Sequence, residues 1–276
     1  MITRICISIN NRCNLNCKYC HFHEKSAFIE PREMNIFAVL DNVKAHIKKH
    51  EIPLFKIGFV GNGEPLLDFE SLRGYVEYIA DYLKSGVISA YTITNGTLIN
   101  EEMLGFFREH KINVGFSIDG VREIHNKLRC NSFDRTMNGI ELFRKINGFY
   151  PSMNCTVGQD VLERADETID FFAPFDSRIT FSRMIGENGI SLADFRAFIE
   201  RASRKLSVRT GGFDCTMYGG KCGAGIDNPY FANGSVFICG NCVDLPTVIS
   251  ADTPLDEIDL GIKPFDRRFC YKEVMR

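Results

Sequence analysis

The chain has 276 residues, 45% of them hydrophobic and 25% charged, which is the balance of a folded globular protein with a sizeable core. Its formal net charge of −2 gives no basic field to attract nucleic acid and no polybasic attraction to a membrane surface. No apolar run approaches the ~20 residues that a membrane-spanning helix needs, and the first residues lack the pattern of a signal peptide, so we expect a cytoplasmic protein.

Along the chain, short β-rich runs alternate with segments of helical periodicity or composition. The β-rich runs cover residues 4–9, 55–60, 89–94, 113–118, 153–157 and 178–183. The helical segments cover residues 35–49, 69–84, 101–110, 135–145, 163–172 and 192–206. This alternation predicts parallel strands joined by right-handed crossovers, in an open sheet or in part of a barrel. Both folds bind ligands at the carboxyl ends of their strands, so we expect the functional groups there.

Eleven cysteines are many for a chain expected in a reducing compartment. Disulfides are disfavoured there, so clustered cysteines are more often metal ligands or catalytic groups. Cys6, Cys130 and Cys155 are isolated, and Cys6 and Cys155 lie in β-rich runs where a small buried hydrophobe is expected. The others form one group near the start and one in the last quarter of the chain: Cys13, Cys17, Cys20, Cys215, Cys222, Cys239, Cys242 and Cys270.

The first group follows the first predicted strand with the spacing C-x3-C-x2-C, as Cys13-Asn-Leu-Asn-Cys17-Lys-Tyr-Cys20. Three thiolates on one loop can bind three irons of a [4Fe-4S] cluster and leave the fourth iron open to an external ligand. A zinc site completed by His21 or His23 is the alternative, because C-x2-C followed by histidine is a common zinc pattern.

With Tyr19 before its last cysteine, this loop resembles the signature of the radical S-adenosylmethionine (SAM) superfamily. The resemblance implies an α/β fold, with a partial (β/α)6 TIM-like barrel over residues 1–190. A small Cys/Gly-rich C-terminal auxiliary-cluster domain, preceded by a bridging helix, would occupy residues 191–276. The resemblance also implies that SAM binds the open iron and is cleaved by an electron from the cluster. The resulting 5′-deoxyadenosyl radical would take a hydrogen atom from the substrate.

The ends of the next three predicted strands carry segments that resemble motifs of the same superfamily. Gly61-Asn62-Gly63-Glu64-Pro65 resembles its Gly-Gly-Glu-Pro motif, which binds the amino group of SAM, although Asn62 departs from the pattern. Thr94-Asn95-Gly96-Thr97 and Ser117-Ile118-Asp119-Gly120 resemble segments of members that carry extra clusters. Each segment alone is also a turn signal. Their order along the chain favours the resemblance, which implies SAM contacts from Tyr19, Gly63, Glu64, Thr94, Asn95, Ser117 and Asp119.

Two further residues match positions that contact SAM in the superfamily. Arg129 stands where an arginine pairs with the SAM carboxylate, and a guanidinium suits such a bidentate contact better than a lysine. An exposed surface charge is the alternative for Arg129. Met184, at the end of the sixth predicted strand, matches the region that packs on adenine.

The chain after about residue 209 is rich in glycine and cysteine, which predicts a small unit held by ligands more than by an apolar core. The spacing from Cys222 through Gly234 to Cys239 resembles the opening of the SPASM or twitch auxiliary-cluster domain. The later SPASM cysteines are incomplete, so we predict one auxiliary [4Fe-4S] cluster, bound by Cys215, Cys222, Cys239 and either Cys242 or Cys270. A structural zinc knot is the alternative.

The resemblance implies a peptide or protein substrate, which superfamily members with such C-terminal regions cross-link, epimerise or oxidise. Radical oxidation of a small-molecule alcohol is the second hypothesis, and a noncatalytic zinc-binding protein is the third. The expected partners are a cellular reductant such as flavodoxin or ferredoxin and, because the first strand begins almost at Met1, a separate leader-peptide-binding protein. The sequence names no catalytic base or hydrogen donor, although four residues are expected near the cavity mouth: Asp119, Glu187, Asp214 and Tyr218.

Overall fold

The computed structural model describes residues 1–20, 22, 33–186, 189–209, 215–225, 229–245 and 247–274. Its centre is a curved eight-stranded sheet with the order β6-β5-β4-β3-β2-β1-β7-β8. The parallel strands follow one another in chain order as β1 Arg4–Ser8, β2 Phe55–Val60, β3 Ile88–Thr94, β4 Asn113–Ser117, β5 Ser152–Val157 and β6 Ile179–Arg183. This order is that of a partial barrel, so the predicted α/β fold and all of its predicted strands are confirmed.

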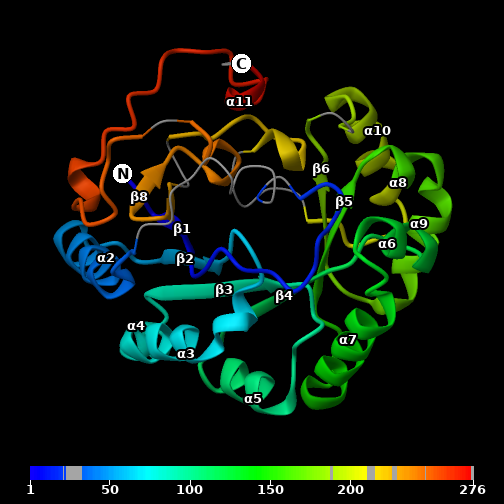
Figure 1. Cartoon of the computed structure of the whole chain (residues 1–276), viewed down its shortest axis with the longest axis horizontal. Coiled ribbons are helices and arrows are strands. Elements are labelled where there is room, and N and C mark those ends of the chain that lie inside the picture. Colours follow the sequence, from blue (N-terminus) through cyan, green and yellow to red (C-terminus); the bar gives the residue numbers. More distant parts are fainter. Residues whose placement is uncertain are drawn as a thin grey trace.

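Helices pack on the outer face of this sheet (Figure 1). They are α2 Ile36–His50, α3 Phe69–Tyr78, α4 Ala80–Ser85, α5 Glu101–Glu109, α6 Arg122–Leu128, α7 Phe133–Asn147, α8 Gln159–Glu163, α9 Ala165–Phe172 and α10 Leu192–Ala202. The short helix α11, Tyr271–Val274, lies apart from this layer in the C-terminal region. Side chains alternate between the two faces of each strand. In β3, for example, Ile88 and Ala90 are buried in the main core, whereas Tyr91 lines the interior of the barrel. None of the helices within the described residues is long and apolar enough to cross a lipid bilayer.

Apart from the short helices α8 and α11, which the sequence also missed, the helices differ from the prediction in two places. The segment 69–84 forms two helices, because the backbone of Ile79 (φ −111°, ψ 14°) ends α3 and α4 begins after it. Val76, Ile79 and Leu83 are all buried, so the apolar spacing continues across the break. Apolar periodicity shows which side chains face the core and does not show whether the helical hydrogen bonds are continuous. The seven-residue helix α6 is too short for periodicity to reveal, and the sequence missed it.

The sheet continues beyond residue 190, where the sequence predicted a new domain. β7, at Tyr230–Ala232, pairs parallel with β1, and β8, at Ser235–Phe237, pairs antiparallel with β7. The phenylalanines of α10 pack into the main core of the barrel. A separate small apolar cluster forms around Cys222, Cys242 and Tyr271. The C-terminal part therefore extends the barrel sheet as well as making a core of its own, and the division at residue 190 stays a prediction.

Candidate active site

The loop that carries the first three cysteines leaves β1 and packs directly against the end of β2. The backbone N–H of Glu64 donates to the carbonyl of Arg12 at 2.8 Å, and the side chain of Asn10 donates to the carbonyl of Glu64 at 3.1 Å. A Cβ atom at Gly63 would lie 1.9 Å from the Arg12 carbonyl oxygen. Only glycine allows this approach of the two backbones. Gly63 therefore serves here to seat the cysteine loop.

Further hydrogen bonds hold the cysteine loop from β3 and α6. Asn14 donates to Thr97 Oγ1 at 2.8 Å and accepts from Asn95 Nδ2 at 2.9 Å, while the N–H of Lys18 donates to the carbonyl of Leu128 at 2.9 Å. The loop is thus fixed at several points before any cofactor binds. The sequence interpretation missed Asn14, although its position between Cys13 and Cys17 was visible.

Asn62, the departure from the superfamily motif, has a structural partner on each side. Its amide donates to Asn11 Oδ1 at 2.8 Å and its own oxygen accepts from the hydroxyl of Tyr230 at 2.7 Å. A glycine at this position could make neither contact. Asn62 therefore links the cysteine loop to β7 of the C-terminal region.

The spacing of the thiols fits a cluster better than a single metal ion. Cys13, Cys17 and Cys20 are all half-buried and unpaired. Among the described residues, no three cysteine sulfurs all lie within 4.8 Å of one another. Thiolates that share one tetrahedral zinc ion stand about 3.8 Å apart, given the usual Zn–S length, and thiolates that bind separate irons stand farther apart. The arrangement favours an iron–sulfur cluster. His21 and His23, the zinc alternative, lie outside the described residues.

Burial makes the free thiols weak acids. It raises the pKa of Cys13 and raises the pKa of Cys17 to about 12, although the charge of Arg129 opposes both shifts. Ligating thiols must lose their protons, so the positive charge of the bound iron has to supply the free energy for that step.

Glu64 is held with its carboxylate buried beside the cysteine loop. Glu64 is only 2% exposed to solvent. Oε1 accepts from Thr94 Oγ1 at 2.6 Å and Oε2 accepts from the N–H of Asn95 at 2.7 Å. Burial raises the pKa of Glu64, and these hydrogen bonds oppose the rise. Thr94 and Asn95, predicted as direct SAM contacts, orient this carboxylate in the structure.

Asp119 is the centre of a second buried network. Its Oδ2 accepts from Arg129 Nε at 2.6 Å and from the hydroxyl of Tyr19 at 2.5 Å, and its Oδ1 accepts from the N–H of Thr156 at 2.9 Å. Burial alone would lower the pKa of Arg129, but the charges of Asp119, Tyr19 and Cys17 raise it overall. The guanidinium is therefore a permanent cation fixed above the cysteine loop. Asp119 is a buried anchor for Arg129, and the exposed-surface alternative for Arg129 is wrong, because the residue is 8% exposed.

His125, which the sequence interpretation did not single out, supports Asp119 from α6. Its Nδ1 accepts from the N–H of Asp119 at 3.2 Å, so its proton resides on Nε2, which lies 2.9 Å from Ser132 Oγ. Burial lowers the pKa of His125 to about 4, so the ring is neutral at physiological pH.

A small cavity at the ends of β5 and β6 lies between two residues that the sequence predicted as cofactor contacts. It has a volume of about 270 Å³, and both Tyr19 and Met184 line it. Its position at the carboxyl ends of the strands, with an aromatic and a thioether wall, suits a planar heterocycle. Ser117 ends β4 beside Asn154 of β5 and is half-buried.

A larger cavity of about 900 Å³ opens at the amino ends of the strands, the end of the barrel opposite the cysteine loop. Its lining includes Tyr91 and Tyr218 together with several cations: Arg4, Lys56, Arg108, Lys111, Arg178 and Arg209. Burial, followed by the charges of Arg4 and Arg209, lowers the pKa of Lys56. Tyr218 lies near the C-terminal thiols, since the charge of Cys215 is the largest influence on its pKa after burial. Glu187 and Asp214, the other predicted candidates besides Asp119, lie outside the described residues.

The five C-terminal cysteines come together although they are spread from residue 215 to residue 270. Burial, helped by the charges of Cys239, Cys270 and Cys222, raises the pKa of Cys215 to about 12. Cys239 and Cys242 have their sulfurs 3.5 Å apart. The structure therefore gathers every predicted auxiliary ligand, but no third sulfur among these described cysteines lies within 4.8 Å of both Cys239 and Cys242.

A comparison with protein families identifies one domain in the chain. The model of the radical SAM superfamily matches residues 7–172. The chain is 28% identical over 180 residues to a cysteine-type anaerobic sulfatase-maturating enzyme of Clostridium novyi, a match that covers 61% of this chain and 47% of the relative. It is 29% identical over 230 residues to a serine-type anaerobic sulfatase-maturating enzyme of Bacteroides thetaiotaomicron, covering 75% of this chain and 54% of the relative. The matches thus span about half the length of these relatives.

Solved structures show the same fold. The structure of anSMEcpe with bound AdoMet (SAM) superposes with a TM-score of 0.74 at 21% sequence identity, covering 93% of this chain and 80% of that one. A second structure of anSMEcpe, with AdoMet and a peptide, superposes equally well, with a TM-score of 0.74. At this level of identity the agreement establishes the architecture, including the C-terminal part of the chain.

Proposed function

Because the chain belongs to the radical SAM superfamily and is an enzyme that uses a [4Fe-4S] cluster and SAM, we propose that it abstracts a hydrogen atom from a peptide or protein substrate. When bound, these two cofactors supply one-electron chemistry that generates a 5′-deoxyadenosyl radical. The observation that carries the proposal is the pre-fixed cysteine loop, with its three separated thiols beside the carboxylate of Glu64 and the guanidinium of Arg129.

The residues around the loop have complementary charges for an amino acid group. Cys13, Cys17 and Cys20 would hold the cluster. Glu64, a buried carboxylate, would accept hydrogen bonds from an ammonium, and Arg129 would receive a carboxylate. Asp119, Thr94 and Asn95 act as positioning residues, because they hold these two charges in place.

The cavity between Tyr19 and Met184 would hold the adenine. Both side chains line the same space at the strand ends, next to the cysteine loop. The aromatic ring of Tyr19 is in turn fixed by its hydrogen bond to Asp119 at 2.5 Å. A site that holds the amino acid end and the adenine end of one molecule would orient it without further rearrangement.

A peptide substrate is supported by the relatives. Two of them are sulfatase-maturating enzymes, and a matching structure of anSMEcpe contains a bound peptide. The 900 Å³ cavity gives no support here, because its cations lie at the amino ends of the strands, at the end of the barrel opposite the cysteine loop.

We also assign an auxiliary [4Fe-4S] cluster to the C-terminal cysteines, with Cys270 as the fourth ligand beside Cys215, Cys222 and Cys239. The charges of Cys222, Cys239 and Cys270 all raise the pKa of Cys215. Cys242 instead lies against Cys239, and its hydrogen bond there is the largest cause of its raised pKa. Cys242 is then the spare thiol. Since the cysteines are not in disulfides, the proposal includes a reducing cytoplasm and a protein reductant of the flavodoxin or ferredoxin type.

The decisive experiment uses protein purified and reconstituted without oxygen. We expect about eight irons per chain, from two cubane clusters, and release of 5′-deoxyadenosine from SAM under reduction. Cys17→Ala should lower the iron by about four and abolish the release. Cys130→Ser is the matched control, because Cys130 is exposed and a serine hydroxyl can keep its two hydrogen bonds to the backbone of Asn16 in the cysteine loop. Unchanged 5′-deoxyadenosine release in Cys17→Ala would refute the assignment.

The substrate class is tested by deuterium transfer. Peptides with deuterium at a side-chain carbon are incubated with enzyme, SAM and reductant. Deuterium recovered in 5′-deoxyadenosine, with a mass change in the peptide, supports the proposal. Transfer from a small deuterated alcohol, with none from any peptide, would replace it by alcohol oxidation.

A further inference from the structure

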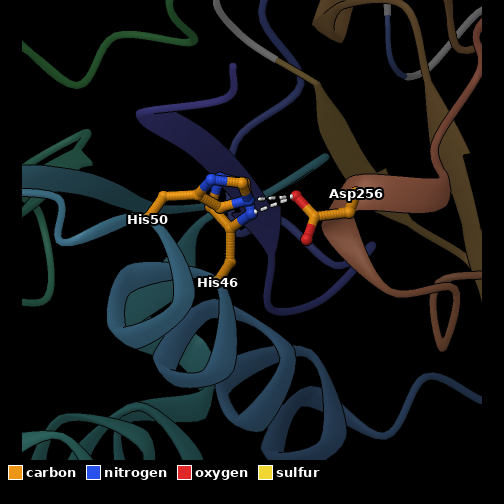
Figure 2. A group of neighbouring side chains, drawn as sticks. All are labelled: His46, His50 and Asp256. Carbon is orange, nitrogen blue, oxygen red and sulfur yellow. Dashed lines mark hydrogen bonds and ion pairs between the residues drawn. The ribbon is translucent and has the colours of Figure 1, made fainter.

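His46, His50 and Asp256 form a compact cluster away from both cysteine groups (Figure 2). The two histidines lie four residues apart on α2, a spacing that places both rings on one helix face. Asp256 comes from the short 3₁₀ helix η5, Leu255–Glu257. One ligand atom from each residue lies within 4.8 Å of the other two.

One carboxylate oxygen faces both rings. Asp256 Oδ1 lies 2.8 Å from His46 Nδ1 and 2.8 Å from His50 Nε2. In a tetrahedral site with metal–ligand lengths of about 2.1 Å, the ligand atoms stand about 3.4 Å apart. The carboxylate oxygen would therefore need to lie about 0.6 Å farther from each ring nitrogen to admit an ion.

The environment of His46 favours a cation between it and Asp256. The His46 side chain is 3% exposed, and its Nε2 lies 2.9 Å from the carbonyl oxygen of Ile2, which can only accept a hydrogen bond. A neutral ring therefore places its proton on Nε2 and turns the lone pair of Nδ1 toward the carboxylate. Nδ1 is buried and makes no well-formed hydrogen bond to any described residue. Two electron pairs facing each other repel, and a metal ion between them removes the repulsion.

The contact between His46 Nε2 and a backbone carbonyl is itself a feature of metal-binding histidines. Such ligands commonly donate their second ring N–H to a carbonyl or carboxylate, which fixes the tautomer and the orientation of the ring. The other carboxylate oxygen, Asp256 Oδ2, binds Lys49 Nζ at 2.7 Å. Lys49 thus leaves Oδ1 for the metal and balances part of the charge of Asp256.

We propose that His46, His50 and Asp256 bind a divalent transition-metal ion of the zinc type. Two imidazoles and one carboxylate suit zinc, and with the partly exposed His50 and Asp256 side chains a water molecule can complete the shell. The proposed ion is separate from the iron–sulfur chemistry and does not depend on the proposed function.

The place of the site in the fold gives it a structural role. His46 holds the backbone of Ile2 just before β1, and Asp256 belongs to the segment that runs from β8 toward Cys270. A neighbouring hydrogen bond, from Asn42 Nδ2 to the carbonyl of Asp252 at 3.0 Å, crosses the same interface. A metal ion here would fasten the C-terminal segment to the helix layer of the barrel.

The test adds Zn²⁺ to anaerobically reconstituted enzyme whose cysteine sites already hold iron. We expect one additional zinc per chain by elemental analysis, and a rise in Tm of about 5 °C at a hundredfold excess over Kd. His50→Ala and Asp256→Asn should lose both effects. His110→Ala, which removes the histidine at the C-terminal cap of α5, should keep them. Because His50 and Asp256 are partly exposed, neither substitution should prevent folding.

Cobalt substitution identifies the ligand type. Co²⁺ in the proposed site should show weak visible d–d bands without the strong near-ultraviolet charge-transfer band that thiolate ligands produce. Loss of these d–d bands in His50→Ala, with retention in Cys17→Ala, supports the site and separates it from the cysteines. Failure of the unsubstituted enzyme to bind additional metal, or equal binding by His50→Ala, would overturn the proposal and leave a hydrogen-bonded histidine–aspartate cluster.

Discussion

The two groups of cysteines are organised in opposite ways. The first group lies on one short loop that backbone and asparagine contacts from β2, β3 and α6 hold in place. The second group is gathered from distant parts of the chain into a small apolar cluster with few regular elements. In the first, the fold positions the thiols, whereas in the second, we infer that bound metal must position much of the fold, as in other small metal-held units.

Removal of the metal should separate the two regions most strongly. In enzyme stripped of iron without oxygen, we expect amide hydrogen exchange between residues 215 and 274 to accelerate at least a hundredfold. The strands β2 to β5 should stay protected, because their core does not depend on a cluster. Hydrogen exchange measured by mass spectrometry reports both regions in one experiment. Equal acceleration in the two would contradict the comparison.

Arg129 tests the first region with the next largest effect. Arg129→Met keeps the length of the side chain but leaves Asp119 buried without its counter-charge, which costs about 3–5 kcal/mol of unfolding free energy. SAM binding should be lost as well. Arg267→Met is the control in the second region, where the guanidinium donates only to backbone carbonyls. Calorimetry should show a much smaller loss of stability for Arg267→Met than for Arg129→Met. Equal losses would mean that the buried Arg129–Asp119 pair contributes no more to stability than an ordinary arginine.

The close approach at Gly63 gives a third, smaller effect. Gly63→Ala places a methyl group against the Arg12 carbonyl, so the cysteine loop must shift, at a cost of about 2 kcal/mol. The iron content of the first site should fall with it. Gly105→Ala in α5 meets no atom within 4 Å and should stabilise the chain by about 0.5–1 kcal/mol. Iron analysis and thermal unfolding check both. A Gly63→Ala enzyme with full iron content would show that the loop is less rigid than its contacts indicate.

The sequence predicted those features that local chemistry determines. The β-rich runs located β1 to β6, because alternation of strand and helix composition is visible within each unit. The cysteines and the Gly-Asn-Gly-Glu segment were found because metal and ammonium binding require particular residue types at particular spacings. The strand ends then brought these groups together, as expected for parallel strands.

The features that were missed depend on contacts between distant residues. β7 has three residues and gains its strand conformation from pairing with β1, which no local pattern shows. Asn14 and His125 have ordinary sequence surroundings, and only the fold shows that they hold the cysteine loop and Asp119. The histidine–aspartate cluster joins residues that lie 206 positions apart.

The smallest expected effect is a pH dependence that belongs to the first region alone. Burial lowers the pKa of His125 in the folded chain to about 4, below its usual value of 6.5. The unfolded chain therefore binds the extra proton between these values, and stability falls as the pH drops from 6.5 toward 4. Between pH 7 and pH 5 the loss is about 2 kcal/mol.

The matched variant is His125→Gln, whose side-chain oxygen can accept from the N–H of Asp119 but cannot be protonated. Its Tm should fall less than that of the unsubstituted enzyme over this pH range, and the difference between the two proteins cancels any acid damage to the clusters. The two proteins should differ in how steeply the stability of the barrel changes with pH. Hydrogen exchange of residues 215–274 should show no such difference between them. Identical pH profiles for the two proteins would mean that His125 is protonated in the folded chain, and the network that holds Asp119 would then have to be redrawn.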